Sequence, residues 1–245
     1  LMLLSMLLLA GYVSKPSPII AILWGLAAGL SCVTRYAGIA IVAAGICSML
    51  CLAEATLRRK LIHITVAILP ALIPVSLWLI RNSYLAGNMT NRGIVFRLPT
   101  NADIRSVTGD MSCWLLPKGI PYTIRLFVLC VAITAFILLA ITFVRRISLR
   151  SNPIASLSLI FIICYELLVL FMCLFVDPYV LAEERIQLPI LITAVIFVFS
   201  DGREIVSGRF HQIAFTLALS LAILCTARAV VWESKAKANG LGYTN

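Results

Sequence analysis

Apolar residues dominate this chain in long runs, and short polar segments separate them. The runs cover residues 1–13, 19–53, 61–80, 124–144, 153–176, 186–200 and 211–232. A helix that crosses a bilayer needs about 20 apolar residues, and its backbone must form its own hydrogen bonds because lipid offers none. The pattern therefore predicts an all-α polytopic membrane bundle with about six to seven hydrophobic helices.

The run 19–53 is too long for a single span. As one helix its 35 residues would extend about 52 Å, whereas the hydrocarbon core is about 30 Å thick. A polar break occupies residues 31–36 and is followed by Gly38. We expect a helical hairpin with a short first arm, and we place Arg35 and Tyr36 at its turn, near the membrane surface.

Composition supports the membrane assignment and excludes other classes. The chain is 62% hydrophobic and 12% charged, with a mean hydropathy of +1.05. That leaves too little polar surface for a soluble enzyme, and too much apolar surface for a disordered or fibrous chain. The first residue is a leucine inside an apolar run, so we expect the chain to be the C-terminal portion of a longer protein.

The net charge of +10 does not indicate nucleic-acid binding. Most of the 20 lysines and arginines lie in short clusters between apolar runs, where they set membrane orientation. The eight cysteines include no CxxC pair, so their spacing favours neither a zinc site nor a disulfide framework.

Two compact basic clusters orient the chain. One is Arg58-Arg59-Lys60, and the other comprises Arg145, Arg146 and Arg150. Both are expected on the cytoplasmic side, because short cytoplasmic loops are enriched in lysine and arginine. Alternation then places the loops 81–123 and 176–185 outside. We treat residues 1–245 as a single transmembrane domain with 81–123 as an outer loop, in the plasma (inner) membrane of a prokaryote.

Three arginines fall at helix ends on the predicted outer face, namely Arg35, Arg81 and Arg185. Positive charge is disfavoured there unless it has another role. Guanidinium groups bind phosphate through a planar, bidentate fork. The pattern therefore indicates an anionic ligand at headgroup depth, such as a phosphate-linked lipid. The alternative is that each arginine reaches to lipid headgroups or pairs with a nearby acid such as Glu184.

Three segments carry a family resemblance. Residues 25–38 (GLAAGLSCVTRYAG) form a small-residue helix that ends in a Thr-Arg-Tyr-x-Gly turn. Residues 74–82 (PVSLWLIRN) end in Trp-x-x-Arg-Asn, and residues 184–189 begin a late helix with Arg-x-x-x-Pro. In this order the segments resemble the GT-C membrane glycosyltransferases, specifically the relatives of protein mannosyltransferases and aminoarabinose transferases. The resemblance covers roughly residues 15–200.

The resemblance implies a transferase that moves a sugar from a polyprenyl-phosphate donor to an acceptor outside the cytoplasm. Arg35 and Arg185 would anchor the lipid phosphate, and Arg81 and Asn82 would shape the outer cavity; Tyr36, beside Arg35, is also counted among the substrate-binding residues. The acceptor hydroxyl needs a general base. In this family that base lies in the first outer loop, so we expect the catalytic residue upstream of residue 1 and assign none here. The expected partners are the lipid-linked donor and membrane lipid, without nucleic acid or a soluble cofactor, and the oligomeric state stays open.

Other chemistry-bearing residues have structural alternatives. Glu166 lies near the middle of an apolar run, where an ionisable group is costly. Arg125 and Arg228 are its candidate partners. We favour a structural role for Glu166, in a hydrogen bond between helices. Asp103 and Asp110 in the outer loop could contact the acceptor or a divalent cation, although solvated loop acids are the commoner case. We expect structural roles for His63 and His211, and assign no metal ligands.

Two other function classes stay open. A polysaccharide polymerase or ligase also carries outer arginines around a lipid-linked substrate, but it is expected to have a histidine in its large outer loop, and 81–123 has none. A non-enzymatic transporter or flippase predicts inverted repeats and several membrane-buried charges along a path. No repeat is visible in the sequence, and only Glu166 is deeply placed.

Overall fold

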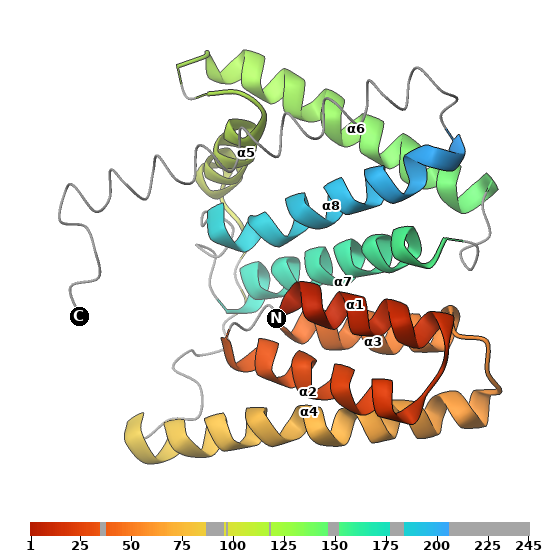
Figure 1. The fold of residues 1–245 in the computed structure, drawn as a ribbon. Coiled ribbons are helices and arrows are strands. Elements are labelled where there is room, and N and C mark those ends of the chain that lie inside the picture. The colour runs from red at the N-terminus through yellow and green to blue at the C-terminus, as the bar shows by residue number, and fades with distance from the viewer. Residues whose placement is uncertain are drawn as a thin grey trace, which may run out of the picture.

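The computed structural model describes residues 1–34, 38–86, 96, 98–117, 119–146, 152–176 and 184–205. Within these residues the chain forms helices and no strands, as the hydropathy pattern predicts. In chain order the helices are α1 (Met2–Ser14), α2 (Pro18–Thr34), α3 (Gly38–Cys51), α4 (Leu57–Ala86), α5 (Asn101–Leu115), α6 (Tyr122–Arg146), α7 (Pro153–Phe175) and α8 (Glu184–Ile205) (Figure 1).

The helices follow the apolar runs closely, with one addition. Helix α5 lies inside the segment 81–123, which we expected to be a loop. Among the described residues, three helical segments are long and apolar enough to cross a membrane: Leu57–Leu85, Tyr122–Arg145 and Pro153–Phe175. They indicate a membrane protein. The remaining apolar helices are shorter and the run 211–232 lies outside the described residues, so the count of six to seven spans stays a prediction.

The predicted hairpin is present, because α2 ends at Thr34 and α3 begins at Gly38. Hydroxyl groups bond to carbonyls in the last turns of α2: Ser31 Oγ donates to Ala27 O at 2.8 Å, and Thr34 Oγ1 donates to Ser31 O at 2.9 Å. A Cβ at Gly38 would overlap the Ser31–Cys32 backbone, so α3 starts directly against the end of α2. Both arms are short, and the second is the shorter, with 14 residues against 17.

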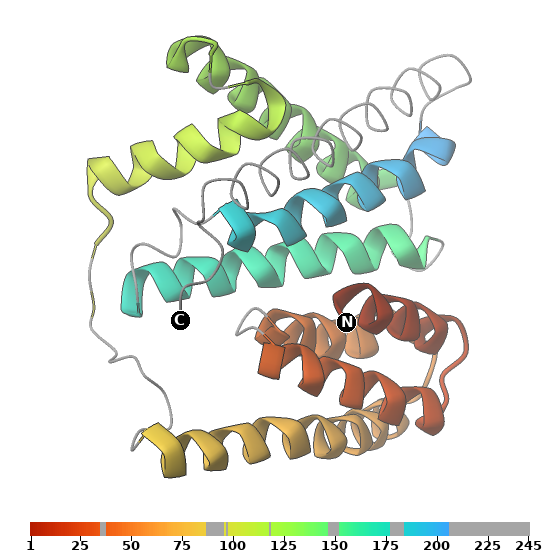
Figure 2. The same ribbon diagram turned by 60° about the vertical axis from the view of Figure 1, so that its left-hand side comes forward.

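The helices pack side by side in a broad bundle (Figures 1 and 2). Helix α4 lies on one edge against α2, α2 packs on α1 and α3, and these contact α7. Helix α8 then covers α7, and α6 lies beyond α8. The main core lies among α1–α4 and α7 around Trp24, which is 1% exposed. A smaller core joins α6, α7 and α8, where the Phe197 ring lies 5.4 Å from that of Phe143.

Small residues set the closest helix contact. A Cβ at Gly25 would overlap the Ala67 carbonyl, and one at Gly29 would overlap the Ala71 backbone. The two glycines are four residues apart on α2, and the two alanines are four apart on α4. Such small-xxx-small faces let helix backbones approach closely in membranes, where packing and not water exclusion drives association.

Candidate functional site

The two ends of the bundle carry different charged segments. Helix α4 begins near Lys60 and ends near Arg81, so we name these the Lys60 end and the Arg81 end. Figures 1 and 2 show that α2 ends, α3 begins, and α6 and α8 begin at the Arg81 end. Helix α3 ends, and α7 begins, at the Lys60 end, where α6 also ends with Arg145 and Arg146. The helix ends that carry Arg58-Arg59-Lys60 and Arg145 therefore lie at the same end, opposite Arg81.

The helix ends that carry or flank the predicted site residues lie at the Arg81 end. Arg81 is exposed and Asn82 is half-buried, both near the end of α4. Arg185 belongs to the first turn of α8, and its side chain lies outside the described residues. Arg35 and Tyr36 also lie outside the described residues, between the ends of α2 and α3. The structure thus places these helix ends at the same end of the bundle, with α4 on one edge and α8 on the far side of α7 (Figure 1). Among the predicted site residues it describes the side chains of Arg81 and Asn82 alone.

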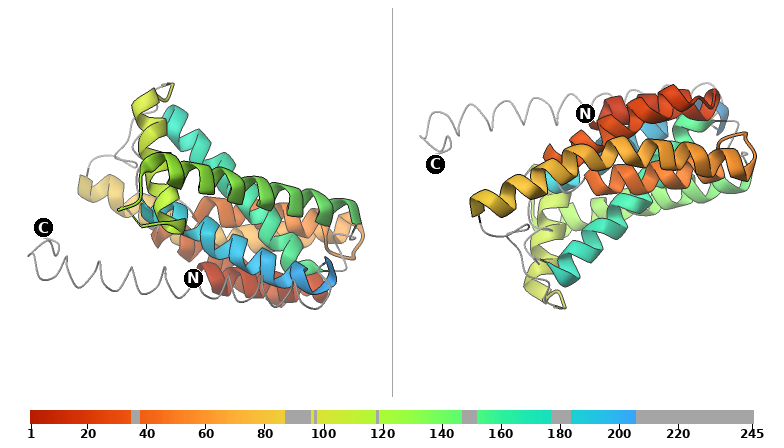
Figure 3. Two further views of the ribbon diagram at one scale, coloured as in Figure 1. Left: turned by 90° about the horizontal axis from the view of Figure 1, so that it is seen from above. Right: turned by 90° about the horizontal axis from the view of Figure 1, so that it is seen from below.

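Helix α5 lies crosswise to α6 at the Arg81 end (Figure 3). It begins with a capping box, in which the Asp103 carboxylate accepts from Thr100 N at 2.8 Å and from Thr100 Oγ1 at 2.7 Å. The Asp103 backbone N–H donates in return to Thr100 Oγ1 at 3.3 Å. Such a box satisfies backbone donors that a helix start leaves unpaired. We therefore assign Asp103 a structural role in starting α5. Asp110, in the same helix, is half-buried.

A polar cluster joins α5 to α6; we call Arg105, Thr108, Tyr122 and Arg125 the Tyr122 cluster. The Tyr122 hydroxyl lies 2.7 Å from Thr108 Oγ1, which orients the ring. The Arg105 guanidinium carbon lies 5.5 Å from the ring centroid, and that of Arg125 lies 5.9 Å from it. Both distances are within the range of cation–π attraction. One tyrosine ring thus adjoins two positive charges.

The two arginines of the Tyr122 cluster differ in what they contact. Arg125 is half-buried, and its Nε donates to Ile120 O at 3.1 Å. Its Nη1 donates to Gly109 O of α5 at 3.4 Å and also contacts Cys113 Sγ. Arg105 is exposed, and no acid among the described residues forms an ion pair with it. Arg125 therefore braces α5 on α6, while Arg105 presents its guanidinium to the surroundings.

The donors of Arg125 do not bond to Glu166; they bond instead to Ile120 O, just before α6, and to Gly109 O and Cys113 Sγ of α5. Glu166 lies on an exposed strip of α7 with Ile163, Leu167 and Leu170. No described residue forms a hydrogen bond or ion pair with it, so the favoured prediction of an interhelical hydrogen bond gains no support among these residues. The other candidate partner, Arg228, lies outside the described residues.

The Lys60 end is held together by buried polar contacts. His63 is buried on α4, and its Nδ1 lies 2.9 Å from the Tyr12 hydroxyl of α1. Lys60 is 7% exposed and donates to Leu50 O at 2.6 Å, which satisfies a carbonyl in the last turn of α3. These contacts agree with the structural role that we predict for His63. His211 lies outside the described residues.

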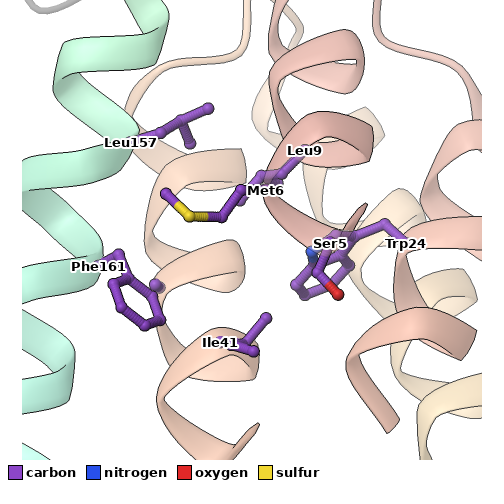
Figure 4. Close-up of a pocket in the computed structure, with 8 residues that line it drawn as sticks. Ser5, Met6, Leu9, Trp24, Ile41, Leu157 and Phe161 are labelled. Atoms are coloured by element: carbon purple, nitrogen blue, oxygen red, sulfur yellow. The ribbon is translucent and has the colours of Figure 1, made fainter. Parts of the chain in front are cut away.

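Within the described part of the chain, no three histidine, cysteine or acidic side chains gather closely enough to hold a metal ion. A small cavity of about 10 Å³ lies in the main core, between α1, α2, α3 and α7 (Figure 4). It is lined by Ser5, Met6, Leu9, Trp24, Ile41, Ala44, Leu157 and Phe161. A cavity with room for about one water molecule is too small for a substrate.

Comparisons with protein-family models, with curated proteins and with solved structures found no match for this chain.

Sequence reasoning missed the Tyr122 cluster, although a signal for it was present. Arg105 and Thr108 are three residues apart, as are Tyr122 and Arg125, so each pair shares one helix face. Recognising the contact required knowing that 101–115 is a helix. The capping box at its start, with threonine three residues before an acid, was the available clue.

Proposed function

We propose that this chain is part of a GT-C type membrane glycosyltransferase that takes a sugar from a polyprenyl-phosphate donor on the extracytoplasmic face. The observation that supports this most directly is the arrangement of helix ends. The segments bearing Arg81 and Arg185, and the helix ends that flank Arg35, share one end of the bundle, whereas the helix ends that bear Arg58 and Arg145 lie at the other. Under positive-inside logic, the Arg81 end then faces outward.

The chemistry of these residues suits the leaving group of such a reaction. Transfer of the sugar leaves negative charge on the lipid phosphate as the bond to the anomeric carbon breaks. Guanidinium groups at headgroup depth would bind that phosphate and stabilise its charge in the transition state. The nucleophile is the acceptor hydroxyl, and the base that takes its proton is assigned to no residue of this chain.

The proposal also includes a multi-pass topology of six to seven spans in a prokaryotic plasma membrane. The three long apolar helices support this topology. The α2–α3 hairpin supports it as well, because its two antiparallel arms could cross the membrane and return. Single-cysteine labelling from each side would test it. Sites beside Arg81 should react from outside, and sites beside Arg58 from inside.

The deciding experiment is an assay of the purified full-length protein for binding and turnover of polyprenyl-phosphate sugars. We expect Arg35→Ala, Arg81→Ala and Arg185→Ala each to weaken donor binding by about tenfold or more, as loss of a charge-assisted hydrogen bond does. Arg58→Ala, which removes an exposed arginine at the Lys60 end, is the matched control and should bind donor normally.

Unchanged donor binding in all three variants would refute the phosphate site. If wild-type protein in vesicles moved the lipid-linked sugar between leaflets without transferring it, the transporter alternative would replace this proposal. Extension of a polymer by the wild type would instead favour a polymerase or ligase.

A further inference from the structure

A second surface at the Arg81 end carries a separate inference, which does not rest on the proposed function. We infer that the α5–α6 corner binds the phosphate of an anionic membrane phospholipid through Arg105, with the Tyr122 ring as its platform. The site lies on helices α5 and α6, and none of its residues is among those assigned to the sugar donor.

Charge is the first argument. Arg105 and Arg125 place two positive charges beside one aromatic ring, and no described acid forms an ion pair with either. The nearest acid in sequence, Asp103, has its carboxylate engaged by the backbone and hydroxyl of Thr100. Two guanidinium groups in one place, with no ion-paired acid among the residues that the structure describes, favour an anion, and phosphate oxygens match the guanidinium fork.

Preorganisation is the second argument. Thr108 holds the Tyr122 hydroxyl at 2.7 Å, and Arg125 ties α6 to the α5 backbone through Gly109 O. The ring over which Arg105 lies is therefore fixed from two sides. A guanidinium stacked on a fixed ring loses less freedom when it binds than one on a mobile chain, which lowers the cost of binding.

The apolar surroundings are the third argument, and they favour a lipid over a free anion. Ile104 precedes Arg105 and is 52% exposed, while Ile124 precedes Arg125 and is 51% exposed. Phe127, one turn further along α6, is 69% exposed. Large exposed apolar side chains beside a cationic group suit an amphiphile, whose acyl chains cover the apolar surface while its headgroup meets the charge.

The test uses native mass spectrometry of the purified, delipidated full-length protein. It is titrated separately with phosphatidylglycerol, phosphatidylcholine and inorganic phosphate. We expect the wild type to bind its first phosphatidylglycerol on the order of tenfold more tightly than phosphatidylcholine, and Arg105→Ala to abolish most of that preference. Arg105→Lys should retain part of it, because lysine keeps the charge without the planar fork. Arg105 is exposed, so far-UV circular dichroism should show wild-type helicity.

The matched control is Arg145→Ala, which removes an exposed arginine from the opposite end of α6 and changes the net charge equally. It should leave the phosphatidylglycerol preference unchanged. An equal loss in both variants, or no loss in Arg105→Ala, would overturn the inference. Inorganic phosphate that bound as tightly as phosphatidylglycerol would show a free-anion site and would also overturn it. Donor turnover that persists in Arg105→Ala would separate this site from the donor site.

Discussion

Replacing Gly25 or Gly29 by alanine tests the closest contact in the bundle. Alanine is the better helix former, so propensity alone would stabilise α2 by up to about 1 kcal/mol. At these positions, however, the added methyl would overlap the backbone of Ala67 or Ala71. A backbone atom cannot rotate away as a side chain can, so α2 and α4 must move apart.

The expected magnitude follows from these opposing effects. Overpacking a tight site costs about 1–3 kcal/mol, and a clash with backbone belongs at the upper end of that range. After the gain in helix propensity, we expect Gly25→Ala and Gly29→Ala each to lower the free energy of unfolding by about 2 kcal/mol. Gly11 of α1 is the control, because a Cβ there would meet nothing within 4 Å. Gly11→Ala should leave stability unchanged or raise it by up to about 1 kcal/mol.

The assay is reversible unfolding in mixed micelles with increasing denaturing detergent, followed by far-UV circular dichroism and by the fluorescence of Trp24 and the other tryptophans. A double variant makes this test of the α2–α4 contact more specific. Adding Ala67→Gly to Gly25→Ala should not restore stability, because the overlapping atom is the Ala67 carbonyl. Equal stability of the Gly25, Gly29 and Gly11 variants, or rescue by Ala67→Gly, would refute the close α2–α4 packing.

Three further predictions concern polar contacts. Tyr12→Phe removes the partner of His63 Nδ1 and should lower the free energy of unfolding by about 1–3 kcal/mol in the same assay, because a buried polar atom loses its hydrogen bond. Lys60→Met keeps much of the buried stem but leaves Leu50 O without its donor, and should cost a similar amount, about 1–3 kcal/mol. Asp103→Ala breaks the capping box, which we expect to cost about 1 kcal/mol and to increase amide hydrogen exchange in the first turn of α5.

Each of these predictions has a refuting result, and Lys60→Met also has a direct control. Arg58→Met removes an exposed charge next to the same helix start and should change stability by less than about 0.5 kcal/mol. A loss equal to that of Lys60→Met would contradict the role assigned to buried Lys60. Wild-type stability of Tyr12→Phe would show that its hydroxyl contributes nothing to the Lys60 end. Unchanged exchange in α5 after Asp103→Ala would contradict the cap.

The hydropathy pattern determined which segments are helical and where the longest run breaks. Helices must satisfy their own backbone in an apolar environment, so a long apolar run leaves little alternative. The polar residues around Ser31 and Thr34 therefore predicted the break between α2 and α3. The clusters of basic residues predicted which helix ends lie at the same end of the bundle. The hydropathy pattern did not predict helix α5, because this helix has few apolar residues. Its stability comes from its capping box and from packing on α6.

Only the tertiary structure decided which residues meet. The sequence contains Gly25 and Gly29, but nothing in it states that Ala67 and Ala71 lie opposite, or that Arg125 reaches the α5 backbone and not Glu166. Spacing along one helix assigns residues to a face. The partner of that face depends on how all the helices fit together, since many pairings of apolar faces bury similar area. Local pattern therefore determined the elements, and close packing and polar satisfaction between distant segments determined their arrangement.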